Sequence, residues 1–432
     1  MYGTNHYPAE VANGAVYAEH AMSCLLWFLV PAVLPLLAVV AELAARGWLR
    51  HRGLYYVFPP GLRLRLRPDP AVFPQFEPLV RFDVNSEGER GDEVPRLRSG
   101  ARLYRALVVG GSQPEGYLLD QDTTWPGGLQ RLLQMPEHLQ RLGVSRVHVG
   151  SIARSGAGSE AVEVILERVL PRYPRLQAII ILVGVSDVFR WLEHGAPPAP
   201  PPPVRTSEVF TWHPEGPFGW KPRELALVEL LLRMRRRWLR PVQVQERVGQ
   251  WVGRARAMRA RAKVIRKTMP DPAPMLQHFE THLRQLLRKA AAHADRVLLV
   301  RQPWFDKNYS PEEAAHMWHG GVGQAWREEV TTYYSFEVVS GLMALLDARA
   351  ARVAAELDVE QLDLMPILER SLNTYYDWLH LSPAGARAVA AAVTATILRR
   401  PRPSPPPPDQ DGDGFASPAM RDPSRCAASP VS

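Results

Sequence analysis

Short apolar runs alternate with amphipathic segments over most of the chain from Arg102 onward. Three runs predict buried strands: ALVVGG, RVHVGSIA and LQAIIILVGV. The last is apolar almost throughout, as expected in the middle of a parallel sheet. The segments between them, WPGGLQRLLQ and SEAVEVILERVLPRY, have the spacing of amphipathic helices. Later stretches, KAAAHADRVLLVRQPW and ARAARVAAELDVEQLDLM, repeat the pattern of helix followed by strand. This alternation predicts βαβ units and a three-layer α/β/α domain around a central parallel sheet.

A continuous apolar run near the N-terminus has a different character. AMSCLLWFLVPAVLPLLAVV, from Ala21 to Val40, contains no charged residue and is long enough to span a bilayer. It predicts a transmembrane helix over about 21–45 within an N-terminal segment 1–45, with a buried core helix as the alternative. Arg46, Arg50 and Arg52 follow the run, so the positive-inside rule places the rest of the chain in the cytoplasm.

Two further segments fall outside the strand–helix pattern. Residues 46–100 predict a connector in which LRLRLRP forms an edge strand. Residues 195–275 predict an insertion that begins with the polyproline stretch APPAPPPPV and continues as an Arg-rich helical part from Leu225 to Met269. We interpret the helical part as a solvated face, and the alternative is a basic surface that contacts anionic lipid headgroups. No readout motif accompanies the basic residues, so no nucleic-acid partner is expected.

The composition offers few candidates for metal or cofactor chemistry. The chain has 432 residues and a net charge of +8, and its two cysteines, Cys24 and Cys426, show no zinc spacing. His316 and His319 are spaced for one helix face but lack a third ligand. The tail segment DQDGDG resembles a calcium loop, but Met420 occupies the position that requires Glu. We therefore predict no metal and no cofactor, and a disordered tail at 401–432.

Polar residues follow the predicted strands at the points where reactive groups collect in α/β sheets. Gly110-Gly111-Ser112 follows the first strand, Arg154-Ser155-Gly156 the second, and Gly184-Val185-Ser186-Asp187 the third. Asp377 and His380 precede the last predicted helix, which Ser382 and Pro383 begin. Because the carboxyl ends of parallel strands meet at one edge, these groups are expected to converge there.

The converging residue types suit acyl-ester chemistry, which needs a nucleophile, a base, a group that orients the base, and donors for the oxyanion. Ser112 is the candidate nucleophile because it lies on a tight turn directly after a strand. His380 is the candidate base and Asp377 its orienting acid. The backbone N–H groups of Ser112 and Gly156 are the candidate oxyanion donors. The pocket walls are expected from loops after Asp187 and around Trp304 and Phe305, and from the insertion.

Four blocks in this order resemble the SGNH/GDSL hydrolase family: VVGGSQPEG, IARSGAGSE, LVGVSDV and DWLHLSPAGA. The resemblance covers residues 101–400 apart from the insertion. It implies a flavodoxin-like fold, the triad of Ser112, Asp377 and His380, and an oxyanion hole of Ser112, Gly156 and the residue at position 186. Two positions depart from the family pattern. Gly111 replaces the usual Asp, and Ser186 replaces the Asn whose amide is the third oxyanion donor.

The predicted function is therefore a membrane-anchored serine esterase or acylhydrolase acting on an acyl-ester substrate, a lipid or an acylated glycan. One alternative is an acyltransferase or deacetylase acting on a glycan or lipid. The other is a catalytically impaired binding domain, which the loss of the Asn at position 186 motivates. The expected location is the membrane, through a single span. The charge bias suggests a cytoplasmic catalytic domain, whereas the resemblance implies an exported one.

Overall fold

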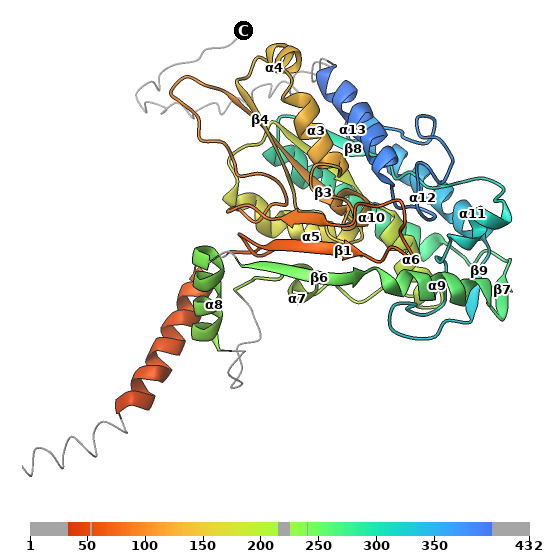
Figure 1. The fold of residues 1–432 in the computed structure, drawn as a ribbon, viewed down its shortest axis with the longest axis horizontal. Helices are drawn as coiled ribbons and strands as arrows, with labels where there is room; N and C mark the ends of the chain where they lie inside the picture. The colour runs from red at the N-terminus through yellow and green to blue at the C-terminus, as the bar shows by residue number, and fades with distance from the viewer. Residues whose placement is uncertain (1–32, 52–53, 215–224, 240, 400–432) are drawn as a thin grey trace, which may run out of the picture. The chain divides into compact units, whose positions relative to one another are not determined.

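The computed structural model describes residues 33–51, 54–214, 225–239 and 241–399 (Figure 1). Its central sheet has five strands in the order β10-β8-β5-β3-β4, and every neighbouring pair is parallel. Numbered along the chain this is the order 2-1-3-4-5, as in flavodoxin-like folds. The predicted central parallel sheet is thus confirmed. The strands are β3 (Leu103–Gly110), β4 (Arg146–Ser151), β5 (Ala178–Leu182), β8 (Val297–Val300) and β10 (Glu360–Leu362).

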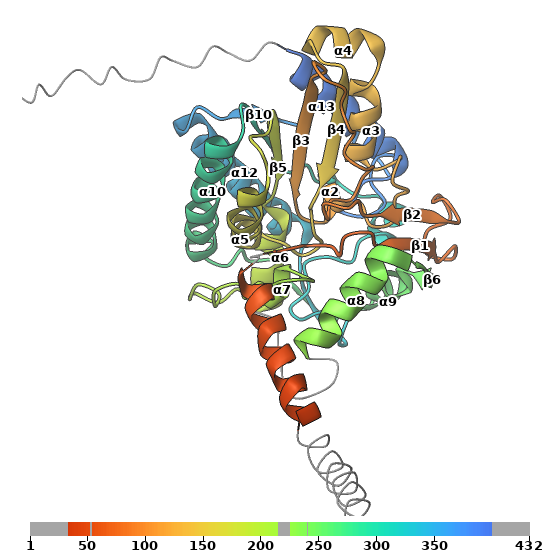
Figure 2. The same ribbon diagram turned by 90° about the vertical axis from the view of Figure 1, so that its left-hand side faces the viewer.

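Helices cover both faces of this sheet (Figure 2). On one face α3 packs against α13, and on the other α10 packs between α5 and α12. The packing follows from apolar stripes, since α10 buries Leu276, Phe279, Leu283 and Leu287 at helical spacing. The helices are α3 (Trp125–Leu133), α4 (Pro136–Leu142), α5 (Ser159–Val169), α10 (Ala273–His293), α12 (Phe336–Glu356) and α13 (Pro383–Leu398).

A second sheet joins the connector to the insertion. Its order is β2-β1-β6, with β1 (Arg63–Pro68) antiparallel to β2 (Val80–Asp83) and parallel to β6 (Val242–Val248). LRLRLRP is thus a strand, but the prediction that it lies at an edge is wrong, because it occupies the centre. Its alternation buries Leu64 and Leu66 while the arginines between them face outward.

The Arg-rich part of the insertion is not helical throughout, as the sequence pattern suggested. Strand β6 separates α8 (Ala226–Leu239) from α9 (Gln250–Ala260), and β7 (Val264–Arg266) then pairs with β9 (Thr332–Tyr334). The remaining elements are short: α2 (Ser112–Glu115), a 3₁₀ turn (Leu170–Arg172), α6 (Val185–Glu193), α7 (Thr206–Val209) and α11 (Pro311–Ala315). Of these, α2 and α6 begin where β3 and β5 end, and they carry residues of the candidate site.

Residues 33–51 form a helix that packs on α8. The Glu42 carboxylate accepts hydrogen bonds from the N–H groups of Ala226 and Leu227 at 2.8 and 3.0 Å, which caps the first turn of α8. None of the helices in the described part of the chain combines the length and apolar character needed to cross a membrane. Residues 21–32 of the predicted span, and the predicted disordered tail, lie outside the described residues. The predicted domain boundaries remain predictions.

Candidate active site

Ser112 lies at the start of α2, immediately after β3, where the chain turns sharply. The preceding Gly110 has φ of +152°, and a Cβ there would stand 2.0 Å from the carbonyl oxygen of Leu182 on β5. Only glycine fits this close approach of the two strands. The turn leaves the Ser112 side chain at the carboxyl edge of the sheet, facing a cavity. This is the predicted location of the nucleophile.

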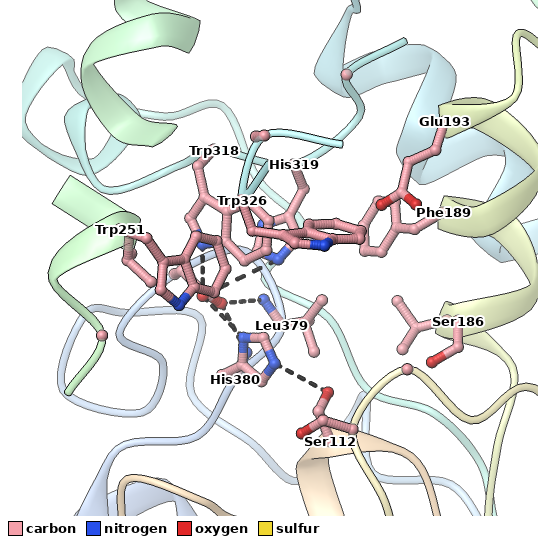
Figure 3. Close-up of a pocket in the computed structure, with 18 of the residues that line it drawn as sticks. Ser112, Ser186, Phe189, Glu193, Trp251, Trp318, His319, Trp326, Leu379 and His380 are labelled. Carbon is pink, nitrogen blue, oxygen red and sulfur yellow. Dashed lines mark hydrogen bonds and ion pairs between the residues drawn. The ribbon is translucent and has the colours of Figure 1, made fainter. Parts of the chain in front are cut away.

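The structure brings Ser112, His380 and Asp377 into one hydrogen-bonded chain. Figure 3 shows the part of it formed by Ser112 and His380. The Ser112 Oγ lies 2.9 Å from the His380 Nε2, and the His380 Nδ1 lies 2.8 Å from the Asp377 Oδ2. The carboxylate of Asp377 is fully buried, whereas the imidazole of His380 retains some exposure. Each distance is that of a good hydrogen bond. The arrangement can pass a proton from a serine hydroxyl to an imidazole whose orientation is fixed.

Asp377 accepts four hydrogen bonds. Its Oδ1 accepts from the backbone N–H groups of Leu379 and His380 at 3.0 and 2.8 Å, and its Oδ2 accepts from His380 and from the indole Nε1 of Trp318 at 3.0 Å. Burial alone raises the pKa of Asp377, but the facing imidazole and these hydrogen bonds hold it well below its usual range. Sequence analysis did not identify Trp318, which comes from a loop without periodic pattern.

His319 lies behind Asp377 as a neutral ring. Burial lowers its pKa to about 3. Its Nε2 stands 4.0 Å from the Asp377 Oδ2, and its ring stacks on Phe189 with centroids 4.9 Å apart. Neither ring nitrogen has a hydrogen-bond partner among the described residues. The sequence analysis considered His319 only as a metal ligand without a third partner, and the structure places it directly against the site.

The candidate oxyanion donors line the same cavity as Ser112. Gly156 has φ of +77° in the turn after β4. The buried Glu115 carboxylate accepts hydrogen bonds from the Ser155 N–H at 2.9 Å and from the Ser155 hydroxyl, which fixes this turn. Ser186 lies in the first turn of α6, and a Cβ on Gly111 would stand 3.3 Å from its Oγ. The predicted residues Ser112, Gly156 and Ser186 are therefore brought together.

Gln113 ties the nucleophile turn to the loop that carries His380. Its side-chain amide donates to the carbonyl oxygen of Leu379, and to that of Pro303 at 3.3 Å. Gln113 is buried, so the two bonds are shielded from water. This contact spans more than 260 residues of sequence and fixes the turn of Ser112 relative to the loop of His380. Sequence analysis did not identify it.

The cavity beside Ser112 has a volume of about 460 Å³ and a largely aromatic wall. Trp251 from α9 meets Trp318 edge to face, with ring centroids 4.9 Å apart, and Trp326 lies beside them. The predicted contribution from the insertion is confirmed by α9. The residues after Asp187 also line the cavity, but they belong to helix α6 and not to the predicted loop. The prediction for Trp304 and Phe305 is wrong, because both side chains are buried in the core and neither lines this cavity.

A second acidic residue, besides Asp377, lines this cavity. Glu193, in the last turn of α6, lines the cavity, and burial raises its pKa to about 8, although the nearby Arg190 opposes the shift. At neutral pH its carboxyl group is therefore mostly protonated and can donate a hydrogen bond into the cavity. Figure 3 shows Glu193 next to Phe189, on the same side of the cavity as Ser186.

Comparison with known proteins gives one family match. Residues 236–395 match the family model described as the SGNH domain (fused to AT3 domains), a range that includes Asp377 and His380 but not Ser112. No curated protein matches the chain.

Several solved structures are similar at low identity. The acetylxylan esterase Axe2 from Geobacillus stearothermophilus is 13% identical, with a TM-score of 0.36 over 69% of this chain and 94% of that chain. A member of the lipolytic protein G-D-S-L family from Veillonella parvula DSM 2008 is 9% identical, with a TM-score of 0.35 over 69% and 100% of the two chains. The alpha/beta hydrolase enzyme LAE5, from the metagenome of Lake Arreo in Spain, is 13% identical, with a TM-score of 0.36 over 69% and 95%.

Proposed function

We propose that this chain is an ester-cleaving enzyme of the SGNH hydrolase type, a serine esterase with Ser112, His380 and Asp377 as its catalytic triad. The observation that carries the proposal is the unbroken chain from the Ser112 Oγ through the His380 imidazole to a fully buried carboxylate. A serine hydroxyl is a weak nucleophile unless a base takes its proton, and the 2.9 Å contact to the His380 Nε2 supplies that base.

The mechanism follows from the atoms that face one another. The Ser112 Oγ attacks the ester carbonyl carbon while its proton moves to the His380 Nε2, and Asp377 holds the Nδ1–H so that the imidazolium is stabilised. The C–O bond to the alcohol then breaks, and the alcohol leaves with the proton from His380. A water molecule, activated by the same imidazole, attacks the acyl-serine and releases the carboxylic acid together with free Ser112.

The oxyanion of each tetrahedral intermediate is assigned to the backbone N–H groups of Ser112 and Gly156, and to the hydroxyl of Ser186. The hydroxyl is a shorter and freely rotating donor compared with the amide of Asn. Losing one oxyanion donor typically costs about 100- to 1000-fold in rate, so a slower enzyme is expected than one with all three donors fully formed.

The substrate is proposed to be an acyl ester whose alcohol or acyl part packs against tryptophan side chains. The aromatic wall of Trp251, Trp318 and Trp326 beside Ser112 supports this, because flat apolar rings contact either an acyl chain or the face of a sugar ring. Transfer of the acyl group to an alcohol in place of water uses the same residues. The family model's description, an SGNH domain fused to AT3 domains, motivates that second candidate. Product analysis with and without a sugar acceptor separates the two.

Membrane association is proposed through the N-terminal helix and α8. Within residues 33–51, Leu34, Leu36, Leu37 and Leu43 each expose between 57% and 62% of their surface, and Trp238 on α8 exposes 83%. An exposed apolar surface of this kind beside several arginines suits an interface with anionic lipid. Flotation of the full chain with vesicles containing or lacking anionic lipid, and its extraction by detergent or high salt, tests the proposal.

Hydrolysis of p-nitrophenyl acetate tests the esterase proposal. S112A should lose at least about 10³-fold in kcat, as removal of a triad member does, while S145A, which removes an exposed serine just before β4, should keep wild-type activity. A fluorophosphonate probe should label the wild type and not S112A. Equal hydrolysis by wild type and S112A would show that Ser112 is not the nucleophile. Failure of the probe to label a folded wild type would favour the binding-domain interpretation.

A further inference from the structure

A second cluster of ionisable side chains lies outside the active-site cavity, between α5 and α10. His278 and His282 are four residues apart on α10, so their side chains lie on the same face of the helix. Glu160, in the first turn of α5, faces them. One potential ligand atom from each of the three residues lies within 4.8 Å of the other two. Two imidazoles and a carboxylate are a ligand set that suits divalent transition metals.

The distance between two of these atoms fits a metal better than a direct hydrogen bond. The His278 Nε2 lies 3.3 Å from the Glu160 Oε2, which is beyond the usual 2.7–3.2 Å range of an N–H···O bond. In a tetrahedral zinc site, bonds of about 2.0–2.1 Å place neighbouring ligand atoms roughly 3.3–3.4 Å apart. His278 and Glu160 therefore already have the separation that a shared ion requires, and the third ligand needs a side-chain shift of about 1.5 Å or less.

His282 has the outer hydrogen bond that metal-binding histidines usually have. Its Nδ1 lies 2.7 Å from the Glu163 Oε2, which fixes the ring and leaves the Nε2 free. Glu163 in turn accepts from the Lys289 ammonium at 2.7 Å. A carboxylate behind the imidazole sets the tautomer and increases its basicity as a ligand. If His278, His282 and Glu160 only formed hydrogen bonds with one another, no such second carboxylate behind His282 would be needed.

The surroundings leave room and charge for an ion. A cavity of about 230 Å³ borders Glu160 and His278, so a water molecule or a further ligand can complete the coordination. Three residues supply carboxyl groups here: Glu160, Glu163 and Asp187. Two cations lie nearby, since Lys289 contacts Glu163 and Arg190 lines the cavity. With neutral imidazoles, three acidic groups against two basic ones favour a cation.

We propose that Glu160, His278 and His282 form a binding site for a divalent transition-metal ion of the Zn²⁺ type, with Glu163 as the residue that orients His282. The site links α5 to α10. Because the Glu160 Oε1 also accepts the Val204 N–H at 2.9 Å, the segment after the polyproline stretch is held as well. Helix α5 begins three residues after Gly156, so the ion would stiffen the turn that carries a candidate oxyanion donor. The site does not depend on the esterase assignment.

Titration of the full, chelator-treated chain with Zn²⁺ and with Co²⁺ tests the site. We expect one equivalent of Zn²⁺ by calorimetry, a rise in the melting temperature, and visible Co²⁺ absorption bands of a low-coordinate site with nitrogen and oxygen ligands. H278A and H282A should each weaken the affinity at least about 100-fold, and E163Q about 10- to 100-fold. The matched control is H293A, which removes a histidine of the same helix whose Nδ1 contacts a backbone carbonyl.

Two further variants keep the result decisive. H278Q and H282Q retain most of the side-chain volume, and circular dichroism establishes that they are folded. The other cluster of suitable ligand atoms among the described residues is His319, Asp377 and His380, so H380A reports any binding at the triad. The proposal is overturned if folded H278Q and H282Q bind Zn²⁺ as tightly as H293A. It is equally overturned if H380A alone abolishes binding, or if the wild type binds neither ion.

Discussion

Replacement of Asp377 by Asn is the most informative single change, because every hydrogen-bond partner of this carboxylate is a donor. The Oδ1 accepts from two backbone N–H groups, and the Oδ2 accepts from the His380 imidazole and the Trp318 indole. An Asn side chain has one acceptor oxygen and one NH₂ group. Whichever way it turns, the NH₂ group faces two groups that donate in the wild type.

The structure decides between the two orientations. If the NH₂ group takes the place of the Oδ1, the backbone N–H groups of Leu379 and His380 both lose their partner. If it takes the place of the Oδ2, only the indole N–H of Trp318 does, because His380 can change tautomer and accept at Nδ1. A buried donor without a partner costs about 1–3 kcal/mol. The first orientation leaves two such donors and the second leaves one, so the second is more stable by about 1–3 kcal/mol.

That orientation removes the base. With Nδ1 unprotonated, the proton of neutral His380 lies on Nε2, which then donates toward the Ser112 Oγ and can no longer accept its proton. Exchange of the triad acid for its amide lowers kcat by about 10⁴-fold, or about 5.4 kcal/mol at 1.36 kcal/mol per decade. We expect D377N to show a loss of this size in p-nitrophenyl acetate hydrolysis, and to be destabilised by about 1–3 kcal/mol in urea unfolding.

A double-mutant cycle with W318F isolates the indole bond. In the wild-type background W318F removes a hydrogen bond to a charged acceptor, worth about 1.5–3 kcal/mol, whereas in the D377N background it removes the conflict with the NH₂ group. The coupling energy in stability should therefore be at least about 1.5–3 kcal/mol, while the loss in kcat persists in the double mutant. W326F, which changes a tryptophan of the same cavity, should show no coupling. If D377N retains kcat within tenfold of the wild type, Asp377 does not set the tautomer of His380.

Two further expectations concern Ser186 and Glu193. S186A removes the proposed hydrogen bond from the Ser186 hydroxyl to the charged oxyanion, and such a bond contributes about 1.5–3 kcal/mol. In steady-state hydrolysis kcat should therefore fall about 10- to 150-fold, with KM unchanged. An unchanged kcat would remove Ser186 from the oxyanion hole. For Glu193, the folded-state pKa of about 8 lies above the ordinary value of 4.5, so its contribution to stability is complete below pH 4.5 and is lost as the pH rises to about 8. The melting temperature of E193Q should therefore fall less than that of the wild type between pH 5 and 9. Parallel plots of melting temperature against pH for the two proteins would contradict this expectation.

The central sheet could be predicted from the sequence because burial on both faces leaves a continuous apolar run. All five residues of β5 are buried, and the run LQAIIILVGV identified this strand without any knowledge of its partners. Strand β6 could not be predicted in the same way. Its residues are almost all exposed, it lies between two Arg-rich helices, and its pairing with β1 joins positions about 180 residues apart. Such a strand depends on a tertiary contact that local pattern does not encode.

The residues of the site likewise divide into those that local sequence pattern indicates and those that depend on long-range contacts. Ser112 and His380 could be predicted because they border regular elements, and topology brings the ends of parallel strands together. Trp318 and Gln113 could not, because the role of each depends on one long-range hydrogen bond rather than on spacing. For Glu193 the decisive quantity is the burial of a carboxyl group in a cavity wall, which has no sequence signature.

The two departures from the family pattern, Gly111 and Ser186, are neighbours in space rather than independent losses. A Cβ on Gly111 would stand 3.3 Å from the Ser186 Oγ and 3.2 Å from the carbonyl oxygen of Ala157, so these neighbours would have to move by a few tenths of an ångström. Gly111 therefore has little space for a side chain while the residue at position 186 keeps its present place. The small side chain of Ser186 and the missing side chain of Gly111 therefore border the same space beside Ser112. We therefore propose an oxyanion hole that is locally rebuilt around small residues, and not one that merely lacks a single amide. On that view the hydroxyl of Ser186 belongs to the catalytic design, and the depth of the S186A defect measures how well it replaces the amide.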